Sequence, residues 1–91
     1  PDGLMLGPNR ARPGDVVIYS TSWCPSCNAA KQWMRQEGFA YTECDVERDA
    51  SCTARWQALG GNGVPYVVVR GKLLEGGFDS RAFVAALERG G

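Results

Sequence analysis

Runs of β-branched residues alternate along this chain with apolar residues at helical spacing. The continuous apolar run 16–19 is typical of a central strand that is covered on both faces. Between Pro25 and Glu37 apolar residues recur at helical spacing, which predicts an amphipathic helix that Gly38 closes. Its apolar side holds Cys27, Ala30, Trp33 and Met34, and its polar side holds Asn28, Lys31, Gln32 and Arg35. The alternating segment 39–46 predicts a second strand.

The second half of the pattern predicts two more helices around a hairpin. One helix begins near Asp49, whose carboxylate can cap it. The run 66–69 predicts a third strand, and 72–74 can pair back to it across a tight turn at 70–71. Asp79 can cap a final helix. Its expected buried stripe is Phe83, Ala86 and Leu87. The order β-α-β-α-β-β-α predicts an α/β fold with a four-stranded mixed sheet flanked by three helices.

The first fourteen residues carry three prolines and three glycines and show no period. We therefore expect an irregular leader over 1–14 and one domain over 15–91. A chain of 91 residues encloses a single hydrophobic core. Its first residue is proline, which is typical of a processed or trimmed chain. The expected compartment is the cytoplasm, with the periplasm as the alternative if a leader has been removed.

Charge is balanced, with 10 Lys and Arg residues against 10 Asp and Glu residues. Such a chain has no basic field that would collect phosphates, which argues against nucleic acid and anionic membranes as partners. No apolar run approaches the length that crosses a bilayer. We expect a monomer that binds neither nucleic acid nor membrane.

The four cysteines fall into two kinds by their spacing. Cys24 and Cys27 are two residues apart at the end of an apolar run, which suits a reversible redox pair. Cys44 and Cys52 stand singly inside periodic segments, with seven residues between them. The chain has no histidine and lacks the spacing of a zinc ribbon, so we expect no metal. For Cys44 and Cys52 we expect core packing, with a regulatory disulfide as the alternative.

The sequence Cys24-Pro25-Ser26-Cys27 carries the candidate chemistry. Cys24 follows a predicted buried strand and precedes Pro25, a residue favoured at the first position of a helix. Unpaired N–H groups there, including those of Ser26 and Cys27, favour a thiolate and lower the thiol pKa of Cys24 from its free value of about 8.5. Cys27, one turn later on the apolar side, is suited to resolve a mixed disulfide.

Two other interpretations of this cysteine pair are open. The pair could be two small core residues or half of a metal knuckle. The preceding strand, the proline inside the motif and the lack of other ligands favour redox chemistry. Trp23, beside the first sulfur, is either a lid that stacks on the substrate or a partly buried aromatic residue.

Two further segments are candidates for substrate binding. Pro65 precedes the third strand, and we predict a cis bond there, which costs only about 0.5–1 kcal/mol. The outward backbone of Val64 would then pair with an extended peptidic substrate. After Gly76 and Gly77, the N–H groups of Phe78 and Asp79 could hold the α-carboxylate of a γ-glutamyl group, and the Asp79 side chain its ammonium. The alternatives are a strand-entry proline and a plain turn with a helix cap.

Together these segments resemble the glutaredoxin family over residues 15–89. The segments that carry the resemblance, in the family's order, are 20–27, 64–65 and 76–79. The resemblance implies a thioredoxin-like fold, catalysis by Cys24 and Cys27, no tightly bound cofactor, and glutathione as co-substrate in the reduction of protein disulfides or glutathione mixed disulfides. It implies these binding residues: Trp23, Ser26, Val64, Pro65, Gly77, Phe78 and Asp79.

Three residues depart from the family's pattern. Thr21 stands where family members usually carry a lysine, Ser26 replaces the commoner tyrosine, and Gly63 replaces a threonine. Loss of the lysine removes a cation that would favour both a thiolate and a glycyl carboxylate. The scaffold is also similar to the NrdH redoxins and mycoredoxins, which take electrons from thioredoxin reductase or from mycothiol.

Three classes of function follow. The leading hypothesis is a thiol-disulfide oxidoreductase in which Cys24 attacks a substrate disulfide. The second is a module that holds an iron-sulfur cluster through Cys24, which Pro25 disfavours because it stiffens the loop. The third is a non-catalytic interaction domain, which the intact cysteine pair disfavours.

Overall fold

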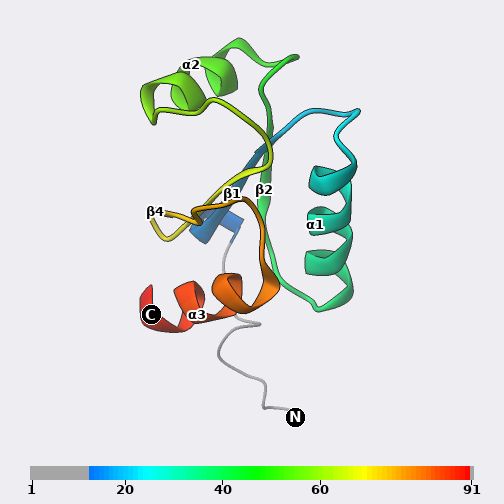
Figure 1. The fold of residues 1–91 in the computed structure, drawn as a ribbon, viewed down its shortest axis with the longest axis vertical. Coiled ribbons are helices and arrows are strands. Elements are labelled where there is room, and N and C mark those ends of the chain that lie inside the picture. The colour runs from blue at the N-terminus through cyan, green and yellow to red at the C-terminus, as the bar shows by residue number, and fades with distance from the viewer. Residues whose placement is uncertain (1–12, 91) are drawn as a thin grey trace.

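A computed structural model describes residues 13–90, so the predicted leader falls almost wholly outside the described residues. In chain order, the elements are a 3-10 turn at Pro13–Asp15, β1 (Val16–Ser20), α1 (Pro25–Gln36), β2 (Thr42–Asp45), α2 (Ala50–Ala58), β3 (Tyr66–Val69), β4 (Lys72–Leu73) and α3 (Ser80–Gly90) (Figure 1). This order and the four-stranded mixed sheet confirm the predicted α/β architecture. None of the described helices is long and apolar enough to span a membrane.

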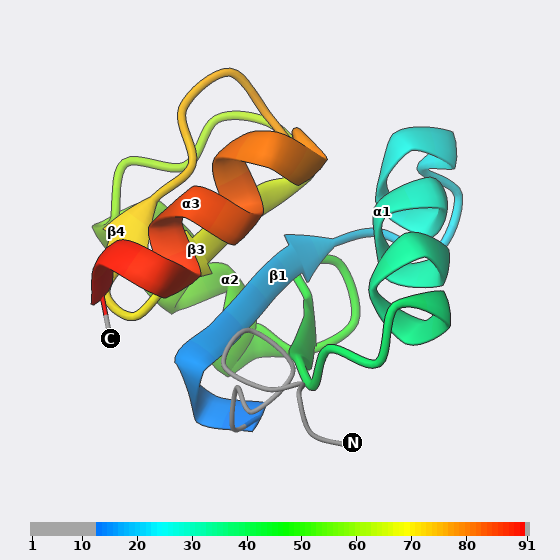
Figure 2. The same cartoon turned by 90° about the horizontal axis from the view of Figure 1, so that it is seen from below.

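Strand β1 lies inside the sheet, whose strand order is β2-β1-β3-β4. It pairs in parallel with β2 and antiparallel with β3, and β3 forms a hairpin with β4. Val16 and Ile18 belong to a core that α1 and α3 also line, whereas Tyr19 belongs to a second core beside α2. Figure 1 shows α2 and α3 at opposite ends of the view, and in Figure 2 β1 runs between α1 and α3. Strand β1 is therefore covered on both faces, as predicted.

The first core is dominated by an aromatic cluster that joins the end of α1 to α3. Phe83 is fully buried, and its ring lies 5.0 Å from that of Phe39 in an edge-to-face arrangement. The ring of Trp33 stacks on Phe39 at 5.4 Å and also contacts Phe78 at 5.6 Å. Such pairs add to the stabilisation from burial alone. The cluster thereby fixes the segment before α3 against α1.

The second core contains the other two cysteines. Cys44 and Cys52 are both buried, which confirms the predicted core packing. They form a disulfide with a Cα–Cα distance of 5.4 Å, so the pairing considered as the alternative is present as well. The Arg55 guanidinium donates a hydrogen bond to Cys44 Sγ at 3.1 Å. The disulfide joins β2 to the first turn of α2.

Strand β2 is shorter than the predicted 39–46. The N–H groups of Gly38 and Phe39 donate to the carbonyls of Arg35 and Met34, at 3.2 and 2.8 Å. These two bonds form a Schellman cap, and Gly38 has the left-handed φ of +81° that the cap requires. Phe39 therefore belongs to the end of α1 and turns into the core instead of starting the strand.

Lys31 was expected on the polar side of α1, and this expectation is wrong. The residue is only 8% exposed, and its Nζ lies 2.6 Å from Glu43 Oε2 on the edge strand β2. The Ser20 hydroxyl donates to the same carboxylate oxygen at 3.2 Å. Because α1 packs against the sheet, the aliphatic part of this lysine is buried between them, while its ammonium reaches Glu43 on the edge strand.

The helix caps at Asp49 and Asp79 and the hairpin turn at 70–71 are formed as the sequence predicts. Asp49 Oδ1 accepts hydrogen bonds from the N–H groups of Ser51 and Cys52, at 2.9 and 3.4 Å. Asp79 Oδ2 accepts one from Ala82 N–H at 2.9 Å. Arg70 and Gly71 both have positive φ, as a tight two-residue hairpin turn requires. All three features are local, so the sequence suffices to predict them.

Replacement of Phe83 by alanine should lower the free energy of unfolding by about 3–5 kcal/mol, because it empties the centre of the aromatic cluster. Chemical denaturation measures this loss. Val84→Ala, at a half-buried neighbour on the same helix, should cost clearly less. Equal losses for the two variants would contradict the central position of Phe83.

Asp49 should contribute to stability in a pH-dependent way. Its pKa is held below the usual 3.8, chiefly by the Ser51 hydroxyl and then by the Cys52 and Ser51 N–H groups. A carboxyl whose pKa is lowered by folding stabilises the protein above its unfolded pKa, and that contribution disappears as the pH falls through the folded pKa. Asp49→Asn keeps a capping oxygen that does not titrate. The variant should lose less stability than the parent between pH 5 and pH 2 in acid titrations of unfolding, and an identical pH slope would contradict this role.

Candidate active site

Cys24 is the N-cap residue of α1, as predicted. Its Sγ accepts a hydrogen bond from the Cys27 N–H at 3.0 Å, and Pro25 occupies the first helical position. The two cysteines form a pair with a Cα–Cα distance of 5.2 Å. Cys24 is 4% exposed and Cys27 fully buried, so Cys24 is the more accessible of the two sulfurs.

The loop before the helix sets the position of this sulfur. The Cys24 N–H donates to the Thr21 carbonyl at 3.4 Å, and the Asn28 side chain donates to the Ser22 carbonyl at the same distance. Thr21 is buried, and its hydroxyl has no hydrogen-bond partner among the described residues. The loop therefore passes directly from the end of β1 to the helix N-terminus, with no cationic side chain within it.

The electrostatics of the helix N-terminus favour a charged sulfur. An amide N–H aimed at Sγ stabilises a thiolate more than a neutral thiol, and the helix dipole adds in the same direction. Of the two N–H groups expected to act here, that of Cys27 is hydrogen-bonded to the sulfur. This arrangement suits Cys24 to nucleophilic attack, with Cys27 beside it to displace a bound group.

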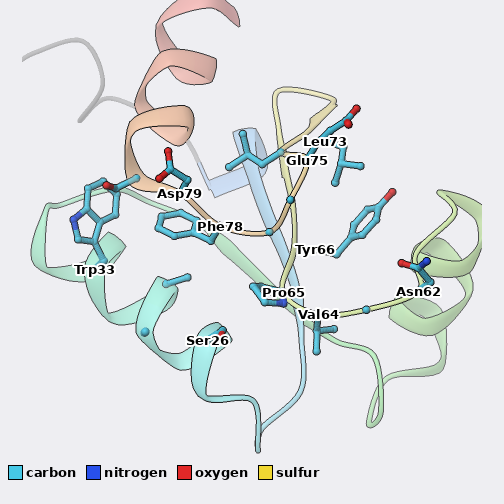
Figure 3. Close-up of a pocket in the computed structure, with 17 residues that line it drawn as sticks. Ser26, Trp33, Asn62, Val64, Pro65, Tyr66, Leu73, Glu75, Phe78 and Asp79 are labelled. Atoms are coloured by element: carbon cyan, nitrogen blue, oxygen red, sulfur yellow. The ribbon is translucent and has the colours of Figure 1, made fainter.

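A groove of about 830 Å³ begins beside Ser26 and runs between α1 and the loops before β3 and α3 (Figure 3). Six predicted binding residues line it: Ser26, Val64, Pro65, Gly77, Phe78 and Asp79. Gly63 and Gly76, which belong to the two predicted binding segments, also line it. The remaining lining residues were not predicted from the sequence: Ala29, Ala30, Trp33, Asn62, Tyr66, Leu73, Leu74, Glu75 and Ser80. Three separate chain segments thus meet to form one concave surface, the usual form of a ligand site.

The bond between Val64 and Pro65 is cis, which confirms the prediction. Figure 3 shows Pro65 and Val64 on the side of the groove that faces Ser26 on α1. Pro65 stands directly before β3, so it removes no donor from the ladder that β3 forms with β1.

The far end of the groove is built by the segment before α3. Gly76 and Gly77 have φ values of +82° and +89°, which a residue with a side chain adopts only under strain. Phe78 packs into the aromatic cluster, and Asp79 caps α3. Glu75 and Asp79 place two carboxylates in the lining, whereas the described lining residues include no lysine or arginine.

Trp23 is not among the residues that line this groove. Its side chain is 64% exposed, and its Nε1 donates a hydrogen bond to Glu47 Oε1 at 3.0 Å. The interpretation as a partly buried aromatic residue is therefore wrong. Glu47 lies 24 residues further along the chain, and no local pattern points to it.

A four-stranded mixed sheet, helices on both faces and a Cys-x-x-Cys pair at the start of a helix define a thioredoxin-like fold with a redox site. The glutaredoxin family model matches residues 16–74. A glutaredoxin of Pseudomonas aeruginosa is 37% identical over 78 residues, which cover 84% of this chain and 87% of that protein. The chain belongs to the glutaredoxin family, whose members are thiol-disulfide oxidoreductases.

Two solved structures show the same relationship in three dimensions. The holo form of glutaredoxin C1 from Populus tremula x tremuloides superposes with a TM-score of 0.65, at 25% identity, over 85% of this chain and 86% of that chain. A buckwheat glutaredoxin-glutathione complex superposes with a TM-score of 0.55, at 25% identity, over 65% of this chain and 57% of that chain. The fold around the cysteine pair is thus shared with glutaredoxins of known structure.

Proposed function

We propose that this chain reduces protein disulfides or glutathione mixed disulfides through Cys24 and Cys27, with glutathione as its electron donor. The observation that carries the proposal is the Cys24 sulfur, which caps α1 and accepts the Cys27 N–H at 3.0 Å. A groove of about 830 Å³ is lined by Ser26, two residues after this nucleophile.

The reaction proceeds in two exchanges. The Cys24 thiolate attacks one sulfur of the substrate disulfide, and the other substrate sulfur leaves as a thiolate that takes up a proton. The Cys27 thiol then loses its proton and attacks Cys24 Sγ, which releases the second substrate thiol and leaves the Cys24–Cys27 disulfide. Two glutathione molecules return the pair to dithiols and become glutathione disulfide. Because Cys27 is fully buried, the sulfur within its reach is that of Cys24.

The lining of the groove supports a bound γ-glutamyl or peptidic group. The Val64 backbone, before the cis bond, would pair with an extended substrate in strand fashion. The N–H groups of Phe78 and Asp79 lie at the start of α3, where a carboxylate is favoured. Ser26 and Gly77 line the same groove, whereas Trp23 would contact the part of the substrate that lies outside it. The buckwheat complex supports glutathione as a ligand of this scaffold.

One observation favours a second candidate, an electron carrier like the NrdH redoxins or mycoredoxins. The described lining residues contribute two carboxylates and no cation, and Thr21 occupies the place of the family's lysine. Glutathione carries two carboxylates and one ammonium, so such a lining holds it less strongly than a cationic one would. Thioredoxin reductase, or a low-molecular-weight thiol other than glutathione, would then supply the electrons.

Cys24→Ser should abolish turnover in a coupled assay of mixed-disulfide reduction, because a hydroxyl cannot replace the attacking thiolate. Cys27→Ser is the matched control, since it removes the second sulfur and leaves the first. It should retain turnover on glutathione mixed disulfides, where an external thiol releases Cys24, and lose most of it on protein disulfides. Full activity of the Cys24 variant would overturn the proposed function.

The reductant can be identified with the oxidised protein. We expect glutathione with glutathione reductase to reduce the Cys24–Cys27 pair at a rate that rises with glutathione concentration. Thioredoxin reductase in the absence of glutathione should reduce it much more slowly. The opposite result would leave the oxidoreductase assignment intact and establish the second candidate.

A further inference from the structure

An exposed tryptophan beside the candidate nucleophile is held by a carboxylate from a distant part of the chain. Trp23 directly precedes Cys24 and is 64% exposed, yet its indole N–H donates to Glu47 Oε1 at 3.0 Å. A hydrogen bond at the ring edge fixes the direction of the ring and leaves its faces free for stacking. The remaining solvent-exposed aromatic surface is thus kept next to the site of chemistry.

The turn that carries Glu47 is itself firmly braced. Asp45 Oδ1 accepts hydrogen bonds from the N–H groups of Glu47 and Arg48, at 2.9 and 3.1 Å. The Val46 N–H donates to the Ser20 carbonyl at the end of β1, at 2.9 Å. A turn with satisfied amides and a contact to the central sheet holds its side chains in a narrow range of positions.

The second disulfide joins the segment before this turn to the segment after it. Cys44 precedes the turn on β2, Cys52 follows it in the first part of α2, and both are buried. Cys44 is also paired in register with Tyr19 of β1, the strand that leads to Cys24. A disulfide restricts the relative movement of the two segments it joins. The disulfide therefore joins the two segments that flank the turn, and Glu47 of that turn contacts Trp23.

We propose that Glu47 is a positioning residue that fixes Trp23 as a stacking platform for the substrate, and that the Cys44–Cys52 disulfide holds the turn from which Glu47 acts. Groups next to the reacting sulfur of the substrate, such as a peptide plane or an arginine guanidinium, would stack on the ring. The role given to Trp23 rests on the proposed function.

A double-mutant cycle on a peptide-glutathione mixed disulfide tests the first part. Glu47→Ala should raise KM about 3- to 10-fold, the effect of losing one charge-assisted hydrogen bond, with kcat unchanged. Trp23→Phe, which keeps a ring but loses the N–H, should raise KM to a similar level. In the Trp23→Phe background, Glu47→Ala should change KM less than about 2-fold. Effects that multiply would overturn the positioning role.

Two further variants separate positioning from charge. Glu47→Gln keeps a carbonyl oxygen that accepts the indole N–H, so its KM should stay near that of the parent. Glu37→Ala removes an exposed carboxylate at the other end of α1 and should leave KM unchanged. If Glu47→Gln instead matched Glu47→Ala, and both shifted the alkylation pKa of Cys24, Glu47 would act by its charge and the proposal would fall.

The proposed role of the Cys44–Cys52 disulfide as a clamp on the turn that carries Glu47 is tested by removing the disulfide. The double variant Cys44→Ser/Cys52→Ser should raise KM to the level of Glu47→Ala, and adding Glu47→Ala to it should have little further effect. Asp45→Ala removes the other brace of the turn, leaves the core disulfide in place, and should raise KM in the same way. An unchanged KM in Asp45→Ala and in the folded double-serine variant would overturn the clamp.

The cycle also distinguishes this inference from the proposed function. If Cys24→Ser loses turnover but Trp23 and Glu47 show no coupling, the oxidoreductase assignment stands and the positioning role is overturned. If Cys24→Ser retains turnover, both are overturned.

Discussion

The site depends on one hydrogen bond, from the Cys27 N–H to Cys24 Sγ at the first turn of α1. Helices leave their first N–H groups without partners in the backbone, and here a sulfur takes one of them. Pro25 starts the helix without needing a donor of its own, so the chain turns from loop to helix directly after the nucleophile. The favoured location of negative charge is thereby set by the backbone, not by a basic side chain.

Two walls of the groove are joined to each other by aromatic packing in the core. Phe39, at the end of α1, and Phe83 and Phe78, at the start of α3 and just before it, form one aromatic cluster with Trp33. Pro65 stands directly before β3, which pairs with β1, and it lines the same groove as Trp33 and Phe78. The cluster therefore positions two residues of the groove lining, Trp33 on α1 and Phe78 before α3.

The two disulfides, Cys24–Cys27 and Cys44–Cys52, have different surroundings. Cys24–Cys27 stands at a helix N-terminus beside the groove, whereas Cys44–Cys52 is enclosed near Tyr19 and Val46. Among the described residues, no group of three Cys, Asp or Glu side chains could hold a metal, and the chain has no histidine. The four cysteines are therefore two pairs, one placed for exchange and the other joining β2 to α2.

What the sequence alone determined is local. The Cys24-Pro25-Ser26-Cys27 motif, the caps at Asp49 and Asp79, and the turn at 70–71 depend on residues close in the chain, so their spacing predicts them. The Lys31–Glu43 ion pair, the Trp23–Glu47 hydrogen bond and the pairing of Cys44 with Cys52 join separate elements. These contacts are decided by how helices are placed on the sheet, because only tertiary packing brings such residues within bonding distance.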